Sequence, residues 1–402
     1  MLYLYLGNVK DFFMTKKKVL LTYMESGMGH IVSMQSIHDA LHKYEDQVDI
    51  IDSYIMQEDG NKHQIQFEKF IIWETKQTNK IAGYGNFVFF LMDLFAGQKL
   101  LRFTHRVFFW KAVNATLEAF KKRMPDVIVS THYFITYCAV EYKKRYNPNV
   151  KIVTYNPDNN VHTWWDSRDG MFFVNNEQAK EEAIKKRKFL PKNVENVGFT
   201  LRNSVLQTTE SKTFYRKKYR IDDRFTIIVA DGAYASGKAC AVVKELVKTH
   251  MPMNIILIAG KNEKAMKRYH KVAAKLRHKH KEASLRVLGF QPNICELYKA
   301  CDVFITKGGP NAVLDSVCMK TPVVINYYAH PIEKATTNLF CKKMKCGIYE
   351  SSPKKIRKCM ENLIKEPKKL LKIQERLDAM PKLENGAEKI AEYIIKQVQD
   401  EK

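Results

Sequence analysis

The chain has 402 residues, 45% of them hydrophobic, and this length favours two domains with sizeable cores. It carries 67 Lys or Arg against 43 Asp or Glu, for a formal net charge of +24. We rank three explanations for this excess: binding to an anionic membrane surface first, solvated basic helices second and binding to nucleic acid third. Nucleic acid comes last because the chain contains no recognisable RNA-recognition, zinc-finger or basic-zipper module.

The start of the chain, MLYLYLGNVKDFF, has no basic region before its apolar residues, so we do not interpret it as a signal peptide, and Met14 is an alternative start. The longest apolar run, Phe87–Leu94, is interrupted by Asp93 and is too short to span a bilayer. Eight scattered cysteines without a Cys-x-x-Cys pair indicate reduced thiols in a cytosolic protein. Any membrane contact is therefore expected to be peripheral.

The first motif is a strand, a glycine loop and a helix. The strand is Lys18–Tyr23, the loop is Gly27-Met28-Gly29-His30, and the helix runs from about Val32 to Lys43. A dinucleotide-binding loop would need a third glycine at position 32. His30 could be a general base, since an imidazole takes a proton near neutral pH, or it could simply cap its own helix.

The segment Ile55–Lys121 is dense in aromatic residues interleaved with Lys and Arg. Many of these residues must be buried in the helices of the first domain. The density exceeds what a small α/β domain needs, so we expect part of the segment to be exposed and to enter the headgroup region of a membrane.

The rest of the first half alternates strands and loops. Asp126–Ser130 is a strand that ends beside His132, and Val150–Tyr155 is a strand followed by the polar and aromatic loop Asn156–Trp165. The segment Val194–Arg202 resembles the strand that ends the first domain in a known two-domain family, and the domain boundary is expected just after it. Arg202 could bind a diphosphate, because a guanidinium binds phosphate bidentately, or it could be a surface residue of a linker.

The second half opens with the strand Phe225–Ala230 and a loop, Asp231–Lys238. One further strand follows, Asn254–Ala259. The repeated alternation of strands and helices predicts a second α/β unit with a parallel sheet.

The segment Asp302–Asn338 contains two strand-helix units in succession. The loop Lys307-Gly308-Gly309-Pro310 follows the first strand, and Asn311 is the expected N-cap of a helix that carries Asp315 in its second turn. Two helix N-termini side by side at strand ends favour an anionic ligand. The lysine precedes the glycines, so this loop is not a Walker phosphate loop, and an ordinary turn remains the alternative.

These motifs together resemble the two-domain glycosyltransferases that make glycolipids, the monogalactosyldiacylglycerol synthase and processive diacylglycerol glucosyltransferase family. The resemblance covers about Lys18 to Val398. It is carried by the Gly27–His30 loop, the Lys307–Pro310 loop followed by Asp315, and the order of the loops. It implies the GT-B fold, in which two Rossmann-like domains face each other across a cleft and the last helix crosses back to the first domain.

The expected domains are an N-terminal domain that binds the acceptor and the membrane, residues 15–205, and a C-terminal domain that binds the nucleotide-sugar, residues 206–385. Residues 386–402 are expected to form the helix that packs back on the N-terminal domain. The resemblance makes His30 the catalytic base. It assigns the donor side to Arg202, Gly232, Gly260, Phe290, Lys307, Gly308, Gly309, Asp315 and Glu333. It assigns the acceptor side to Gly27, Gly29, His132, His162 and Trp164, with His162 and Trp164 matching only after a one-residue shift in spacing.

The implied reaction moves glucose or galactose from a UDP-sugar to diacylglycerol or a glycosyl-diacylglycerol, with inversion, on the cytoplasmic face of the cell membrane. No cofactor, metal or nucleic acid is expected, and no DxD metal motif is present. Ala312, Ile332 and Thr336 depart from the family pattern, so the transferred sugar stays open. Two alternatives remain: a transferase acting on a peptidoglycan lipid precursor, and a non-catalytic protein that keeps the fold and binds membrane or nucleic acid.

Overall fold

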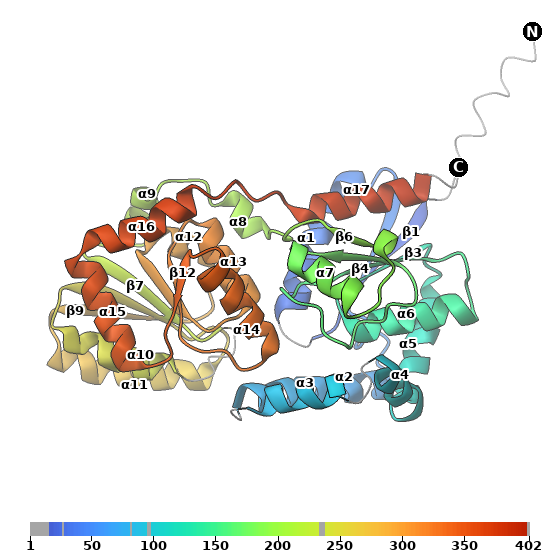
Figure 1. Ribbon diagram of the computed structural model, residues 1–402, viewed down its shortest axis with the longest axis horizontal. Helices are drawn as coiled ribbons and strands as arrows, with labels where there is room; N and C mark the ends of the chain where they lie inside the picture. The colour runs from blue at the N-terminus through green and yellow to red at the C-terminus, as the bar shows by residue number, and fades with distance from the viewer. Residues whose placement is uncertain (1–15, 26–27, 81–82, 95–97, 233–237, 400–402) are drawn as a thin grey trace, which may run out of the picture.

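The computed structural model describes residues 16–25, 28–80, 83–94, 98–232 and 238–399, which form two lobes lying side by side (Figure 1). Each lobe contains a six-stranded parallel sheet covered by helices on both faces. Burial of both faces explains why the strands read as nearly continuous apolar runs. The expectation of an α/β protein with two Rossmann-like domains is confirmed.

The first sheet has the strand order β2-β1-β3-β4-β5-β6. Its strands are β1 (Lys17–Thr22), β2 (Val48–Ser53), β3 (Val127–Ser130), β4 (Lys151–Tyr155), β5 (Met171–Val174) and β6 (Val194–Asn196). The chain leaves β1 toward β2 and then returns to the other side of β1 as β3. The carboxyl ends of β1 and β3 therefore form the topological switch point, which is where open α/β sheets bind ligands.

The helices of the first lobe separate into two layers (Figure 1). They are α1 (Met28–Leu41), η2 (His42–Tyr44), α2 (Lys62–Lys80), α3 (Tyr84–Leu94), α4 (Gln98–Val107), α5 (Trp110–Arg123), α6 (Tyr133–Arg145), α7 (Glu177–Lys185) and η3 (Pro191–Asn193). One layer contains α1, and the other contains α5 and α6 with α2 packed outside them.

The second sheet has the order β12-β11-β10-β7-β8-β9. Its strands are β7 (Phe225–Ala230), β8 (Met253–Ile258), β9 (Ala283–Leu288), β10 (Val303–Thr306), β11 (Val323–Ile325) and β12 (Gly347–Tyr349). The switch point of this sheet lies between β7 and β10, so the loops after these two strands are adjacent.

The remaining helices surround this second sheet, except the last one. They are α8 (Asn203–Gln207), α9 (Lys212–Lys218), α10 (Ala239–Leu246), η4 (Val247–Thr249), α11 (Glu263–Lys279), α12 (Ile294–Ala300), α13 (Pro310–Cys318), α14 (Pro331–Thr337), the π-helix η5 (Asn338–Lys343), α15 (Pro353–Lys365), α16 (Pro367–Asp378) and α17 (Gly386–Gln399).

The last helix, α17, leaves the second lobe and packs on α1 of the first, as expected (Figure 1). Ile390 and Ile394 of α17 are fully buried there. The crossing passes very close to the outgoing connection: a Cβ on Gly386 would lie 2.7 Å from the carbonyl oxygen of Gly198. Only glycine permits this approach, so the two connections between the lobes run in contact.

Two local expectations are wrong. Asn311 is not the N-cap of α13: the helix begins at Pro310, and Gly309 occupies the N-cap position. Proline is favoured in the first helical turn because it has no N–H to leave unpaired there, and this preference outweighs the capping propensity of asparagine. The strand β6 ends at Asn196, because Gly198 adopts a positive φ of 81° that interrupts the ladder.

Within the described ranges, no helix combines the length and the apolar character that a bilayer crossing requires.

Candidate active site

The two switch points contribute loops to the boundary between the lobes. Contacts between the lobes occur there: Asn159 Nδ2 donates to Thr336 Oγ1 at 2.9 Å, and the ring of Phe89 stacks on His330 of the second lobe as well as on Trp164 of its own lobe. Thr336 is one of the departures from the family pattern, and the structure gives it this role in joining the lobes. The predicted acceptor and donor residues therefore lie on opposite sides of one boundary.

His30 lies in the first turn of α1, directly after β1. Its Nδ1 lies 2.5 Å from the carbonyl oxygen of Thr131, and Thr131 Oγ1 donates to the carbonyl oxygen of His30 at 3.0 Å. A carbonyl can only accept, so Nδ1 carries the hydrogen and Nε2 carries the lone pair. Burial lowers the pKa of His30 to about 4, which keeps the imidazole neutral and able to accept a proton.

His132 lies beside His30, and the rings of His132 and His162 both contact Tyr133. His132 caps α6, its Nδ1 accepting the N–H of Phe134 at 3.2 Å, and its ring centre is 4.9 Å from that of His30. Its Nε2 is buried and has no hydrogen-bond partner among the described residues. His162 Nδ1 accepts the N–H of Trp164 at 3.3 Å. Burial lowers the pKa of both rings well below the usual value, so this is a cluster of neutral histidines.

An acidic residue completes this cluster. Asp158 Oδ2 lies 3.8 Å from His162 Nε2. Burial raises the pKa of Asp158 to about 7, so the carboxyl can gain or lose a proton near neutral pH. This aspartate lies in the loop Asn156–Trp165 but was not among the candidate site residues predicted from the sequence.

The predicted acceptor side includes two glycines, Gly27 and Gly29. Gly27 lies outside the described residues. Gly29 lies within α1, and an added Cβ would meet no atom of the described residues within 4 Å. A close backbone approach therefore does not explain Gly29.

On the donor side, Lys307 and Glu333 form a buried ion pair, with Nζ 2.6 Å from Oε1. Glu333 Oε2 also accepts the N–H of Ala329 at 2.7 Å. Burial alone would lower the pKa of Lys307 and raise that of Glu333, but the opposite charge prevails in each case: the pKa of Lys307 is raised and that of Glu333 is lowered. Both groups are therefore charged at neutral pH, at the start of α14.

Two of the predicted donor-side glycines, Gly232 and Gly308, are explained by close contacts. A Cβ on Gly308 would lie 2.7 Å from the carbonyl oxygen of Glu333 and 2.9 Å from Thr337 Oγ1. Gly232 has φ 74°, and an added Cβ would lie 3.1 Å from Cε of Lys307. The loops after β7 and β10 thus meet at Lys307. Gly309 is the N-cap of α13 and makes no such contact.

Arg202 and Asp315 bind each other. Arg202 Nε donates to Asp315 Oδ1 at 3.1 Å, and Nη2 donates to Oδ2. Asp315 is buried, and this bidentate pair joins the last segment of the first domain to α13. The resemblance had assigned both residues to the donor side. Sequence reasoning missed their mutual contact because they are 113 positions apart.

Gly260 and Phe290 lie at the ends of the neighbouring strands β8 and β9. Gly260 has φ 59°, and the Phe290 ring is half exposed, with Lys261 Nζ 4.9 Å from its centre. A flat exposed ring beside a lysine at strand ends is able to stack on a planar base.

Several buried polar atoms near the Lys307 loop have no hydrogen-bond partner among the described residues. They are Thr306 Oγ1, Asn311 Nδ2, both amide atoms of Asn326, and His330 Nδ1. Buried polar groups are normally satisfied, so these are the atoms expected to bind a polar ligand or water. Sequence reasoning missed Asn326 and His330 as site residues. The signal was available, because Asn326 directly follows β11 at the ligand edge of the sheet.

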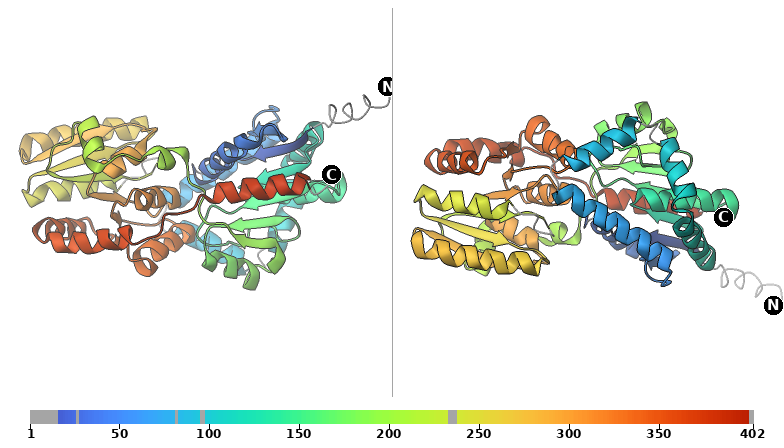
Figure 2. Two further views of the ribbon diagram at one scale, coloured as in Figure 1. Left: turned by 90° about the horizontal axis from the view of Figure 1, so that it is seen from above. Right: turned by 90° about the horizontal axis from the view of Figure 1, so that it is seen from below.

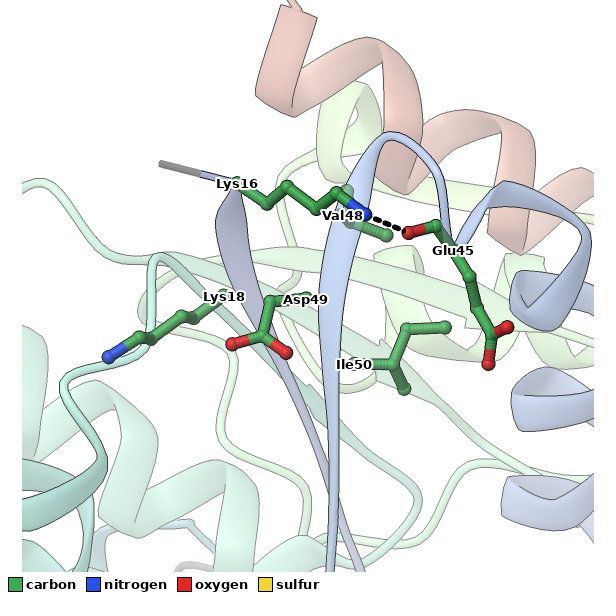
Figure 3. A pocket seen from close by; sticks show the side chains of 6 residues that line it. All are labelled: Lys16, Lys18, Glu45, Val48, Asp49 and Ile50. Atoms are coloured by element: carbon green, nitrogen blue, oxygen red, sulfur yellow. Dashed lines mark hydrogen bonds between the residues drawn. The ribbon is translucent and has the colours of Figure 1, made fainter. Parts of the chain in front are cut away.

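Two other features lie away from this boundary. A cavity of about 490 Å³ lies at the amino ends of β1 and β2, where Lys16 Nζ donates to the carbonyl oxygen of Glu45 at 2.6 Å (Figure 3). Among the described residues, one group of three possible metal ligands occurs, namely His250, His280 and Glu282. It lies just before the amino ends of β8 and β9, opposite the ligand edge.

Comparisons with known proteins agree with the motifs. The chain is 23% identical over 291 residues to a processive diacylglycerol beta-glucosyltransferase of Bacillus licheniformis, covering 72% of this chain and 73% of that protein. It is 22% identical over 376 residues to the Bacillus cytotoxicus protein of the same name, covering 92% and 91%. A probable chloroplastic monogalactosyldiacylglycerol synthase of Nicotiana tabacum is 22% identical, covering 85% of this chain and 63% of that protein. The resemblance to these glycolipid-forming transferases is confirmed.

Solved structures give the same fold. MurG of Acinetobacter baumannii matches with a TM-score of 0.57 at 11% identity, over 96% of this chain and 99% of that one. UGT89C1 of Arabidopsis thaliana, solved with UDP, matches with a TM-score of 0.57 at 12% identity, over 95% and 100%. No family model matches the chain. The fold is therefore that of the two-domain GT-B glycosyltransferases.

Proposed function

We propose that this protein transfers a hexose, glucose or galactose, from a UDP-sugar to the hydroxyl of diacylglycerol or of a glycosyl-diacylglycerol. The observation that carries the proposal is the placement of a neutral His30, with its Nε2 lone pair available, across the lobe boundary from the buried Lys307–Glu333 pair. The names of the relatives from Bacillus and Nicotiana supply the substrate classes.

The donor would bind on the second lobe. The diphosphate would lie at the start of α13, where N–H groups and the helix dipole favour negative charge, with Lys307 and Arg202 as nearby cations. Phe290 would stack on the uracil, Asp315 would accept from the ribose hydroxyls, and Glu333 would accept from the sugar hydroxyls. The amide of Asn326, which has no hydrogen-bond partner among the described residues, supplies a further donor and acceptor.

The reaction would be a single displacement with inversion. His30 Nε2 takes the proton of the acceptor hydroxyl while its oxygen attacks the anomeric carbon, and the bond from that carbon to the UDP oxygen breaks. The charge that develops on the leaving diphosphate is stabilised by the start of α13 and by Arg202. The Thr131 carbonyl holds the Nδ1 hydrogen, so the imidazolium that forms keeps its orientation.

The acceptor is a membrane lipid, and the first lobe has a surface suited to a membrane. Exposed aromatic side chains on α2, α3 and α4 and in the turn before α5 include Trp73, Phe87, Phe90, Phe103 and Phe108. These helices lie along one side of the first lobe, on the same side of the molecule as α11, which is rich in lysine (Figures 1 and 2). Aromatic residues flanked by cations suit peripheral binding to an anionic membrane.

Sugar transfer from radiolabelled UDP-glucose or UDP-galactose to diacylglycerol in liposomes tests the proposal. We expect a labelled glycolipid with one of the two donors, and a loss of turnover by about 100-fold or more in His30→Ala. Failure of both donors, with the protein bound to the liposomes, would refute it. Transfer from UDP-N-acetylglucosamine to a polyprenyl-diphosphate acceptor instead would favour the peptidoglycan-precursor alternative.

A further inference from the structure

The connections that precede β8 and β9 bring together three side chains that are able to bind a metal ion. They are His250, His280 and Glu282, and one ligand atom of each lies within 4.8 Å of the other two. His250 follows the turn η4, His280 ends α11, and Glu282 directly precedes β9. The sheet pairs Met253, the first residue of β8, with Ala283, the first residue of β9, so the two connections meet at the same edge.

This group lies away from the candidate active site. β9 is the edge strand of the second sheet and lies on the side that faces away from the first lobe (Figure 1). The amino ends of its strands are opposite the carboxyl ends, which carry the loops of the candidate active site. No metal is expected here from sequence motifs, because the two histidines belong to separate connections of the chain.

The three side chains are not engaged elsewhere. Among the described residues, no hydrogen bond and no ion pair involves the side chain of His250, His280 or Glu282, and the buried Nδ1 of His280 has no partner. Arg224 Nη1 donates to the backbone carbonyl oxygen of Glu282 at 3.3 Å, but its Nη2 pairs with the carboxylate of Asp222 at 2.6 Å. The charge of this neighbouring guanidinium is therefore already compensated, and the Glu282 carboxylate is available to a cation.

The residue at position 250 is not explained by the turn in which it lies. His250 has a φ of 53°, the left-handed conformation that glycine normally adopts after a helix. Its ring lies beside that of His280, with the ring centres 5.5 Å apart. Each neutral imidazole has one nitrogen with a free lone pair, so two adjacent rings suit a shared cation.

Two imidazoles and a carboxylate indicate zinc. Zinc is bound in proteins by histidine nitrogens and carboxylate oxygens, whereas magnesium and calcium prefer sites made of oxygen alone. Around a tetrahedral zinc ion with bonds of about 2.0–2.2 Å, two ligand atoms lie roughly 3.4 Å apart. Atoms within 4.8 Å of one another reach this geometry through side-chain shifts of about 1 Å, which the exposure of His250 and Glu282 permits.

We propose that His250, His280 and Glu282 form a zinc site in which a water molecule is the fourth ligand. The ion fastens the connection before β8 to the connection before β9 and so stabilises this edge of the second sheet. Because it lies opposite the edge that carries the candidate active site, it takes no part in sugar transfer.

Calorimetric titration of the metal-free full chain with zinc chloride tests the proposal. It uses no sugar donor and no lipid, so its outcome is independent of the proposed transferase activity. The site variant is His250→Asn/Glu282→Gln, because asparagine tolerates the left-handed conformation and glutamine keeps the size of the glutamate. The matched control is His270→Asn/Glu392→Gln, which makes the same substitutions at exposed positions outside the group.

We expect wild type and control to bind one zinc ion per chain. The site variant should bind zinc at least about 100-fold more weakly, since losing a group that only orients a zinc ligand already costs about 10- to 100-fold. Zinc should raise the melting temperature of wild type and control, but not that of the site variant. Equal zinc affinity in wild type and site variant, or no binding by wild type at micromolar zinc, would overturn the site.

Two further measurements check the geometry and the number of chains. Tetrahedral cobalt(II) absorbs visible light much more strongly than octahedral cobalt(II), so the cobalt-loaded wild type should show strong absorption that the site variant lacks. Weak absorption in both would overturn the tetrahedral site. Dimers of wild type that form only with zinc would show that the ion joins two chains, and would overturn a site within one chain. Circular dichroism checks folding, and Glu282→Gln alone keeps the test valid if the double variant unfolds.

Discussion

The buried pair Lys307–Glu333 makes the sharpest prediction about this molecule. The side chains are 18% and 3% exposed, and Nζ lies 2.6 Å from Oε1. In Lys307→Met, the Glu333 carboxylate stays buried with the N–H of Ala329 and with His330 Nε2 at 3.8 Å. Leaving one charge of a buried pair without its partner costs about 3–5 kcal/mol, whereas replacing both charges is often close to neutral.

The double variant Lys307→Met/Glu333→Gln should therefore be more stable than the single variant. Glutamine can keep the hydrogen bond from Ala329, and no buried charge remains without a partner. We expect the double variant to lie within about 2 kcal/mol of wild type. Urea unfolding followed by tryptophan fluorescence and circular dichroism gives the free energies. A single variant that costs less than about 1 kcal/mol, with a double variant no better, would refute the reasoning.

The pH dependence gives a second readout with a definite sign. In wild type the pKa of Glu333 is lowered, so its contribution to stability is present above the usual carboxyl pKa and is lost as pH falls through the lowered value. In Lys307→Met the cation is gone and burial raises the pKa of this carboxyl. The penalty of the single variant should then be largest above neutral pH and shrink as pH falls. A penalty independent of pH would show that Glu333 is not a buried charge.

Three further predictions concern neighbouring positions. Gly308→Ala should lower the free energy of unfolding in urea by about 1–3 kcal/mol, because its Cβ would lie 2.7 Å from the carbonyl oxygen of Glu333. The matched control is Gly29→Ala, whose Cβ would meet no atom of the described residues within 4 Å. Equal losses in the two variants would contradict the contact. Burial raises the pKa of Asp158 to about 7, so ionisation of this carboxyl lowers the free energy of unfolding as pH rises from about 4 to 8. Asp158→Asn should remove this loss, which is on the order of 4 kcal/mol. Parallel pH profiles of stability in wild type and variant would refute this. Arg202→Lys keeps the charge but loses the bidentate contact with Asp315, so it should lower the free energy of unfolding by roughly 1 kcal/mol. It should also weaken UDP binding measured by calorimetry. An unchanged affinity for UDP would show that Arg202 is not part of the donor site.

The strands and their order of appearance could be predicted, because buried parallel strands are short runs of β-branched and aliphatic residues. FTIIVA at 225–230 and VFIT at 303–306 are examples. The loops that follow them could be placed for the same reason, since all parallel strands end at one edge. Lys307 and His30 were found in this way.

Contacts between distant residues could not be predicted. Arg202 and Asp315 each suggested a ligand contact when considered separately, and nothing local indicates that they bind each other. Thr336 counted only as a departure from a family pattern, yet it accepts a hydrogen bond from Asn159 in the other lobe. In both cases the partner is set by how the two lobes pack, which local propensity and periodicity do not contain.

Helix α3 links the surface proposed to bind the membrane to both sides of the candidate active site. Phe87 and Phe90 of this helix are exposed, while the ring of Phe89 stacks on Trp164 at 5.0 Å and on His330 at 6.3 Å. Trp164 belongs to the acceptor side and His330 precedes the helix that carries Glu333. A shift of α3 on a membrane would therefore move a ring that contacts both lobes. The high density of aromatic residues in the segment Ile55–Lys121 thus has two physical reasons. One set of rings is exposed on the surface, and another ring, Phe89, packs at the boundary between the lobes beside the candidate active site.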